Sequence, residues 1–283
     1  MKFGGSTFSS IEFSGRSSLV LFFVGCPLNC PYCHNPELVS GNSNNDETDI
    51  EEVFKIIDES KDYLDAVVFS GGEPLYQLNA LEELLNYSKN LGLETKLDTS
   101  GIYPKKLKKI LHLIDYIALD IKAPFDKYKE ISGCNFGEKV KESMDLINEY
   151  NENNKIDENN ENKNNENKNN ENENNGNSQR TIFLECRTTY SSYFLSKEDI
   201  YRIAKEIRCD LYTIQQFRSK VNLDDRLEGL NSPSPFELKE MALEINSIFE
   251  NNLNNNPNFK NISIKSAEFG NQKIIKDSEI LND

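Results

Sequence analysis

The sequence of 283 residues contains no run of about 18 apolar residues, the length at which a helix can span a membrane. Its first residues, Met-Lys-Phe-Gly-Gly-Ser, also lack the apolar core that a secretory signal peptide needs. The most apolar early run, residues 19–24, is long enough only for a strand. We therefore expect a cytoplasmic protein with no membrane partner.

Positive charge is scarce as well. Lys and Arg together number 32 against 47 Asp and Glu, which gives a formal net charge of −15. A protein that binds nucleic acid through a basic surface has the opposite balance, so we expect no nucleic-acid partner. The six cysteines are not expected to form disulfides in a cytoplasmic protein. Three of them, Cys134, Cys186 and Cys209, are scattered and are interpreted as ordinary thiols.

One segment lacks the apolar residues that a packed fold requires. Residues 151–177 comprise 27 residues, of which 15 are Asn, 7 are Asp or Glu and 3 are Lys. Such a composition cannot bury enough surface to offset the entropy lost on ordering. We predict a disordered insertion at 151–177 within one domain, whose N-terminal part is 1–150 and whose C-terminal part is 178–283.

The rest of the chain alternates short apolar runs with amphipathic segments, after a short edge element within residues 3–18. This pattern predicts a parallel α/β fold. An open, partial (β/α)6 barrel fits the count, and a doubly wound sheet fits it equally well. The predicted strands are 19–24, 66–69, 94–98, 116–122, 181–187 and 211–217, with a last one at 262–267, and the predicted helices are 44–61, 78–92, 104–113, 138–150, 196–208 and 235–249.

Three cysteines follow the first predicted parallel strand at close spacing: Cys26, Cys30 and Cys33. A structural zinc site normally takes four ligands, and so does a ferredoxin-type [4Fe–4S] cluster. Three cysteines on a four-iron cluster would leave one iron open to a small molecule that carries an amine and a carboxylate. The alternative is a zinc knuckle or a set of unrelated thiols.

Further polar motifs come at the ends of the next predicted strands, where a barrel-like α/β fold gathers its functional residues. Glycines allow a close backbone approach to a ligand, and a glutamate beside them can accept from an ammonium group. Two carboxylates and a hydroxyl from neighbouring strand ends suit a hard cation. The structural alternatives are a simple turn at the glycines, an Asp120–Lys122 salt bridge and a structural ion pair of Arg187. The candidates are Gly71, Gly72, Glu73, Asp98, Thr99, Asp120, Lys122 and Arg187.

The cysteine spacing with Tyr32 before Cys33, together with Gly-Gly-Glu-Pro, closely resembles the radical S-adenosylmethionine (SAM) enzymes. The resemblance implies the partial barrel, a [4Fe–4S] cluster on Cys26, Cys30 and Cys33, and SAM on the fourth iron. One-electron reduction would cleave SAM to a 5′-deoxyadenosyl radical, with no catalytic side chain beyond the cluster and SAM. It also implies that the Gly-Gly-Glu-Pro segment binds the methionine amine and that Tyr32 lies near the adenine. Arg187 would bind the SAM carboxylate or ribose.

The longer run of LDTSG, YIALDIKAP, ECRTT and QQF resembles the activating proteins of anaerobic ribonucleoside-triphosphate reductase, a family of glycyl radical enzyme activases. This implies a glycyl radical partner protein, a flavodoxin or ferredoxin as electron donor, and a monovalent cation held by Asp98, Thr99 and Asp120, with Lys122 beside it. The sequence departs from that family at Ser14 and Ser100, where Pro and often Asn are usual. The runner-up is a radical SAM enzyme for a small molecule, such as a 7-carboxy-7-deazaguanine synthase.

Overall fold

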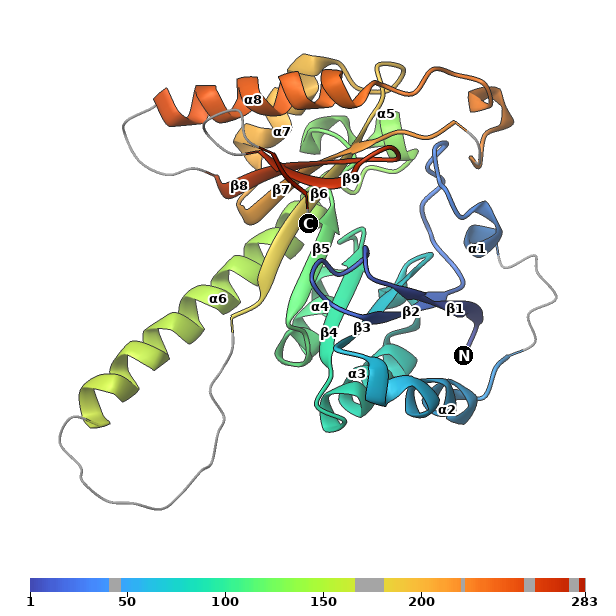
Figure 1. Cartoon of the computed structure of the whole chain (residues 1–283), viewed down its shortest axis with the longest axis vertical. Coiled ribbons are helices and arrows are strands. Elements are labelled where there is room, and N and C mark those ends of the chain that lie inside the picture. Colours follow the sequence, from blue (N-terminus) through green and yellow to red (C-terminus); the bar gives the residue numbers. More distant parts are fainter. Residues whose placement is uncertain (41–46, 166–180, 220–221, 252–257, 275–279, 283) are drawn as a thin grey trace.

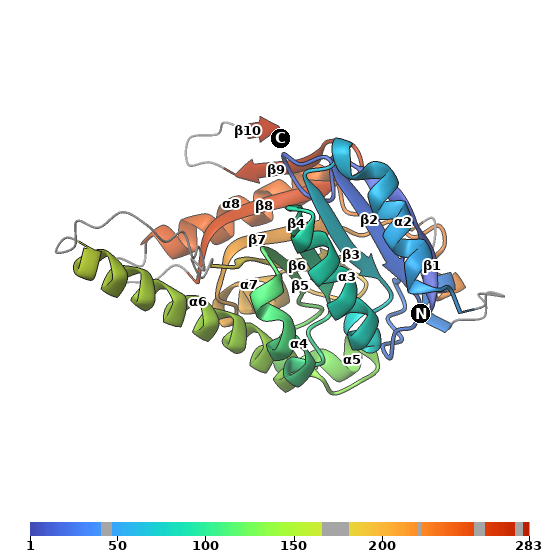
Figure 2. The ribbon, with the colours of Figure 1, turned by 90° about the horizontal axis from the view of Figure 1, so that it is seen from below.

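The computed structural model describes residues 1–40, 47–165, 181–219, 222–251, 258–274 and 280–282. Its described strands form one sheet in which the spatial order of the strands follows the order of the chain. Figures 1 and 2 show this sheet from two directions at right angles. The strands are β1 (Phe3–Ser9), β2 (Ser18–Phe23), β3 (Ala66–Gly71), β4 (Glu94–Thr99), β5 (Tyr116–Asp120), β6 (Phe183–Tyr190), β7 (Cys209–Gln216), β8 (Phe259–Ser266), β9 (Gly270–Ile274) and β10 (Ile280–Asn282).

The strands from β2 to β8 all run parallel, while β1, β9 and β10 pair antiparallel with their neighbours. A doubly wound sheet reverses its strand order near the middle, and this sheet does not. The structure therefore confirms the open barrel and adds an antiparallel hairpin, β9 and β10, that the sequence did not predict.

Helices connect the parallel strands, and α2, α3, α4 and α6 lie along one side of the sheet (Figure 2). The predicted helices are all present, with α1 and α5 as short additions. Asp49 caps α2, since its side chain accepts from the backbone N–H of Glu51. The α-helices are α1 (Pro36–Ser40), α2 (Ile50–Ser60), α3 (Leu78–Asn90), α4 (Pro104–Ile110), α5 (Tyr128–Ser132), α6 (Gly137–Asn165), α7 (Lys197–Glu206) and α8 (Pro235–Asn251).

The two faces of the sheet carry different side chains. One face packs against the helices in a large apolar core that includes Leu19, Leu21, Phe23 and Phe69. On the other face, only a small cluster around Phe13, Val20, Ala66 and Val68 is apolar. This second face, called here the inner face, is therefore available for polar side chains. No helix of the described ranges is long and apolar enough to cross a membrane.

Helix α6 runs further than the sequence predicted. It continues to Asn165, so the predicted helix end at 150 is wrong and the expected start of the insertion at Asn151 needs correction. The side-chain amide of Asn151 donates to the carbonyl of Ile182 at 2.8 Å and accepts from the Ile182 N–H at 2.7 Å. Asn151 thus joins α6 to the chain before β6. Residues 166–177 of the predicted insertion lie outside the described residues.

We expect Asn151→Ala to lower the free energy of unfolding by about 1–3 kcal/mol, because it leaves two buried backbone groups of Ile182 without their partner. Asn153→Ala is the matched control, since Asn153 is exposed on the same turn. Urea denaturation of both variants checks this. Equal midpoints for the two variants would contradict the role given to Asn151.

Candidate functional site

The cysteine loop leaves β2 at the edge of the sheet where the parallel strands end, called here the carboxyl edge. Its first residues are held by α1: Gly25 N–H donates to the carbonyl of Leu38 at 2.7 Å, and Cys26 N–H to that of Val39 at 3.4 Å. Within the loop, Cys33 N–H donates to the carbonyl of Cys30 at 3.1 Å. These bonds fix the backbone that carries all three thiols.

The three thiols are shielded from solvent to different degrees. Cys30 is buried, whereas Cys26 and Cys33 are partly buried. Burial raises the pKa of all three, that of Cys26 to about 12, while the nearby Lys122 ammonium acts in the opposite direction. A cation beside three thiols favours their ionised form, which is the form that binds metals.

These thiols suit a cluster better than a single ion. Among the residues that the structure describes, no three His, Cys, Asp or Glu side chains are placed to share one metal ion. A [4Fe–4S] cluster does not require this, because each cysteine binds a different iron. The donor set fits a cluster with three protein ligands, and the described residues show no group of ligands that would complete a zinc knuckle.

The Gly71-Gly72 turn packs directly on the cysteine loop. A Cβ on Gly71 would lie 2.4 Å from the backbone nitrogen of Phe23, and a Cβ on Gly72 would lie 2.5 Å from the carbonyl oxygen of Gly25. Both glycines are therefore required by contact with β2 and the loop that follows it. Their predicted contact with a ligand stays a prediction. The turn is also hydrogen-bonded to this loop, since Glu73 N–H donates to Gly25 at 2.9 Å.

The Glu73 carboxylate is fully buried and occupied by protein donors. Thr99 Oγ1 donates to its Oε1 at 2.8 Å and Leu75 N–H at 3.1 Å. Ser100 donates to its Oε2 through the N–H, at 2.8 Å, and through the hydroxyl. Burial raises the pKa of Glu73, and these bonds partly offset the rise. In this structure Glu73 holds the end of β4 against the cysteine loop, and both of its oxygens are engaged.

We expect Glu73→Gln to weaken SAM binding by about tenfold or more, because the amide would face the Ser100 N–H with a donor instead of an acceptor.

The folded-state pKa of Glu73 is raised, so its contribution to stability is present at low pH and is lost as the pH rises through that pKa. The stability of the wild type relative to Glu73→Gln should therefore increase as the pH falls towards about 4.5. Denaturation at several pH values measures this, and an unchanged difference would contradict it.

Arg187 lies between the two aspartates for which the sequence predicted a metal cation. Its guanidinium contacts Asp120 Oδ1 at 2.9 Å and Asp98 Oδ1 at 3.3 Å. Burial alone would raise the pKa of Asp98, but Arg187 and Lys96 lower it. Lys122 Nζ lies 3.4 Å from the other oxygen of Asp120. The ion-pair alternatives for Arg187 and Lys122 are thus both present in the structure.

Thr99 does not join this group, because its hydroxyl points to Glu73. The structure brings together Asp98, Asp120, Lys122 and Arg187, and it places Thr99 with the glycine turn. A monovalent cation bound by Asp98, Thr99 and Asp120 stays a prediction, and it would have to share the two carboxylates with Arg187.

Tyr32 lies in the cysteine loop, directly before Cys33. Its ring is 5.1 Å from that of Phe194, and its side chain is 6% exposed. Its hydroxyl has no hydrogen-bond partner among the described residues. A buried hydroxyl without a partner fits a position next to a polar ligand, which agrees with the predicted place of Tyr32 near the adenine.

Sequence reasoning missed a hollow of about 250 Å³ on the inner face of the sheet. Lys96, Arg187 and Lys265 bring positive charge to it, and Glu12 pairs with Lys265 at 3.2 Å. The signal was visible in β4, where the charged residues Glu94, Lys96 and Asp98 alternate with uncharged ones. A strand with charges on alternate residues places them all on one face.

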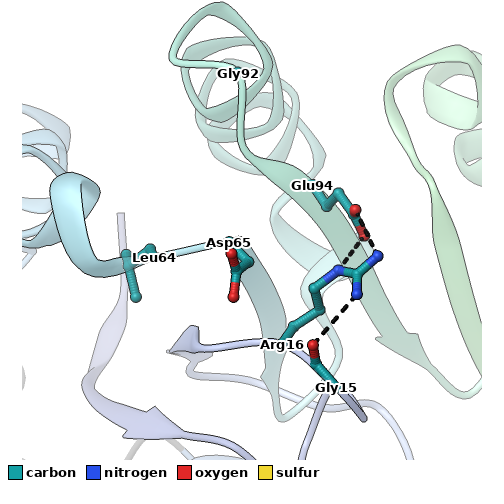
Figure 3. Close-up of a pocket in the computed structure, with 6 residues that line it drawn as sticks. All are labelled: Gly15, Arg16, Leu64, Asp65, Gly92 and Glu94. Carbon is teal, nitrogen blue, oxygen red and sulfur yellow. Dashed lines mark hydrogen bonds and ion pairs between the residues drawn. The ribbon is translucent and has the colours of Figure 1, made fainter.

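A second hollow, of about 370 Å³, lies at the opposite, amino edge of the sheet (Figure 3). Arg16 and Glu94 form an ion pair of 2.9 Å across it, and Gly15 accepts from the same guanidinium. None of the predicted site residues lines this hollow. The predicted site residues lie instead at the carboxyl edge and on the inner face.

Several known proteins have sequences or folds similar to this chain. The family model described as "Radical SAM superfamily" matches residues 20–158. The protein of Methanocaldococcus jannaschii named "Putative glycyl-radical enzyme activating enzyme MJ1227" is 35% identical over 239 residues, which are 83% of this chain and 87% of that protein.

Two further proteins are similar over part of their length. The pyruvate formate-lyase-activating enzyme of Clostridium pasteurianum is 40% identical over 119 residues, 40% of this chain and 50% of that enzyme. The crystal structure of Streptococcus suis SuiB has the same fold, with a TM-score of 0.55 and 15% identity over 87% of this chain and 50% of SuiB. The chain therefore spans about half the length of these two proteins.

The open parallel barrel, the three-cysteine loop and these matches define a radical SAM enzyme. Within that superfamily, the chain belongs to the family of glycyl-radical enzyme activating enzymes. Members of this superfamily use a [4Fe–4S] cluster and SAM, which agrees with the donor set of the cysteine loop.

Proposed function

We propose that this chain activates the anaerobic ribonucleoside-triphosphate reductase by generating its glycyl radical. A bound [4Fe–4S] cluster and SAM would supply the radical chemistry. One electron from a flavodoxin or ferredoxin would divide SAM into methionine and a 5′-deoxyadenosyl radical, and transfer of a hydrogen atom from a glycine Cα of the partner would then give 5′-deoxyadenosine and a glycyl radical. Cys26, Cys30 and Cys33 would hold the cluster.

The chain's own residues would bind and orient SAM between the cysteine loop and the inner face. Lys122 offers a cation close to the three thiols and to Asp120. Arg187, fixed by Asp98 and Asp120, offers a rigid cation towards the carboxylate or ribose of SAM. The buried ring of Tyr32 would contact the adenine.

The observation that best supports a polypeptide substrate is the hollow on the inner face. Gln215, Asn261 and Asn271 line it, and side-chain amides can donate to and accept from an extended backbone. Its position on the same face as Arg187 would allow a glycine loop to approach the SAM site. This reading favours a loop of a partner protein over a small aromatic substrate.

The test is anaerobic reconstitution with iron and sulfide, reduction by dithionite, and incubation with SAM and the anaerobic reductase. We expect about four irons per chain, release of 5′-deoxyadenosine and a glycyl radical signal in electron paramagnetic resonance on the reductase. SAM cleavage without any glycyl radical would refute the proposed partner and favour a small-molecule substrate. A chain that binds zinc and no iron would refute the enzyme chemistry.

A further inference from the structure

Three aromatic side chains are strongly exposed on the connections that follow the neighbouring strands β6, β7 and β8, and Tyr76, after β3, is a fourth at the carboxyl edge. Tyr193 follows β6 and is 53% exposed, Phe236 lies at the start of α8 after β7 and is 68% exposed, and Phe269 lies in the turn after β8 and is 61% exposed. We call these three residues the aromatic rim. Exposed aromatic rings on one edge of a protein often mark a surface that binds another protein.

The connections that carry the rim are bonded to one another. The Tyr190 hydroxyl donates to Glu237 Oε1 at 3.2 Å, which joins the β6 end to the start of α8. Gln216 donates to the carbonyl of Pro233 at 2.9 Å and accepts from the N–H of Ala267 at 2.8 Å. Figure 1 shows β7, β8, β9 and α8 gathered in the same part of the molecule. The rim is thus held on neighbouring, connected segments.

The rim adjoins the cysteine loop through a row of aromatic rings. Phe194, the residue after Tyr193, lies with its ring 5.1 Å from Tyr32 and 5.9 Å from Phe217. The connection before α8 also touches the loop directly, because Asp224 N–H donates to the carbonyl of Pro31 at 3.0 Å. A protein bound on the rim would therefore lie beside the predicted cluster ligands.

The charges around the rim define what kind of surface could bind there. Among the described residues of 191–200, 217–240 and 267–269, the exposed charged residues are five acids and two bases, a net charge of −3: Glu198, Asp225, Glu228, Glu240, Glu268, Arg218 and Arg226. A complementary surface would carry an apolar patch flanked by Lys and Arg, and complementary charge accelerates association and excludes wrong partners.

We propose that the aromatic rim docks the glycyl radical partner protein through an apolar patch flanked by basic residues. This inference rests on the proposed function and adds where the partner binds. The rim would carry much of the binding free energy, because a few exposed aromatic residues usually dominate an interface. The surrounding acids would set the rate of encounter and its dependence on salt.

The test variant replaces Tyr193, Phe236 and Phe269 together with Ser, and Phe236→Ser alone serves as a milder form. The matched control replaces Phe8 and Tyr63 with Ser, because these are 66% and 80% exposed but lie at the amino edge. Each protein is reconstituted with its cluster, and SAM cleavage by dithionite is measured without a partner. Glycyl radical formation on the anaerobic ribonucleoside-triphosphate reductase is then measured against reductase concentration and salt.

We expect the triple variant to cleave SAM at the wild-type rate and to need at least about tenfold more reductase for half-maximal radical formation. The control should match the wild type in both assays, and added salt should weaken the wild-type response. Equal reductase dependence in the triple variant and the control would overturn the docking proposal alone. A change confined to self-association, seen by sedimentation, would overturn it in favour of a second copy on the rim. Failure of the wild type to form any glycyl radical would overturn the proposed function and this inference with it.

Discussion

Replacement of Cys26, Cys30 or Cys33 by Ala is expected to abolish iron binding and SAM cleavage. With two cysteines left, two irons of a [4Fe–4S] cluster would lack protein ligands. The measurements are iron and sulfide content, visible absorbance and release of 5′-deoxyadenosine after anaerobic reconstitution. The expected loss is to background in each variant, which is the largest effect that any single side chain should have.

The matched controls are Cys134→Ala, Cys186→Ala and Cys209→Ala. Cys186 and Cys209 are buried in the apolar core on β6 and β7, and Cys134 lies in the connection before α6. These variants should keep full cluster absorbance, although the two core variants should lose some stability from the cavity they leave. Loss of iron from a folded Cys186→Ala protein would contradict the assignment of the three ligands.

Replacement of Arg187 by Met is expected to have the second largest effect. It would leave Asp98, whose side chain is 11% exposed, and Asp120 without the cation between them. Removal of one partner from a buried ion pair costs about 3–5 kcal/mol. SAM affinity should fall as well, because the two carboxylates would keep only Lys96 and Lys122 as partners and would repel the SAM carboxylate more strongly. Urea denaturation and equilibrium SAM binding measure the two effects.

The double variant Asp98→Asn, Arg187→Met separates stability from binding. It removes the charge of one of the two carboxylates that have lost Arg187, so it should recover part of the stability while SAM affinity stays low. If Arg187 is only structural, SAM affinity should recover together with stability. A separate experiment tests the predicted monovalent cation. If the cation is present, SAM cleavage by the wild type should differ between sodium and potassium, and Asp120→Ala should remove that difference. Equal activity in both salts would leave Arg187 as the cation that balances the two aspartates.

The sequence predicted the parallel strands well because each is a short apolar run that ends in a polar motif. The end of β4 shows what it could not predict. Asp98 and Thr99 are adjacent in sequence but point to opposite faces of a strand, so only one of them can reach Arg187. Period-two alternation could have separated them, but nothing in the sequence indicates that Glu73 would take the Thr99 hydroxyl.

Other misses came from contacts between distant segments. The glycines at 71 and 72 suggested a close approach, but only the packing of the two segments shows that Gly71 lies against Phe23 and Gly72 against Gly25. Contact of the two glycines with a ligand stays a prediction. Helices α1 and α5 have five residues each, too few for a periodic pattern. The low apolar content after residue 150 predicted disorder, and the bonds of Asn151 to Ile182 depend on polar groups that composition does not reveal.

The match between strand order and chain order has a consequence for folding on the ribosome. Each strand from β2 to β9 pairs with the strand made just before it, so the sheet can grow by one strand at a time as the chain emerges. Arg187 arrives only with β6, and until then Asp98 can remain hydrated. The ion pair between Glu12 and Lys265 joins residues 253 positions apart. We expect it to form last, so the curvature of the sheet would be completed only near the end of synthesis.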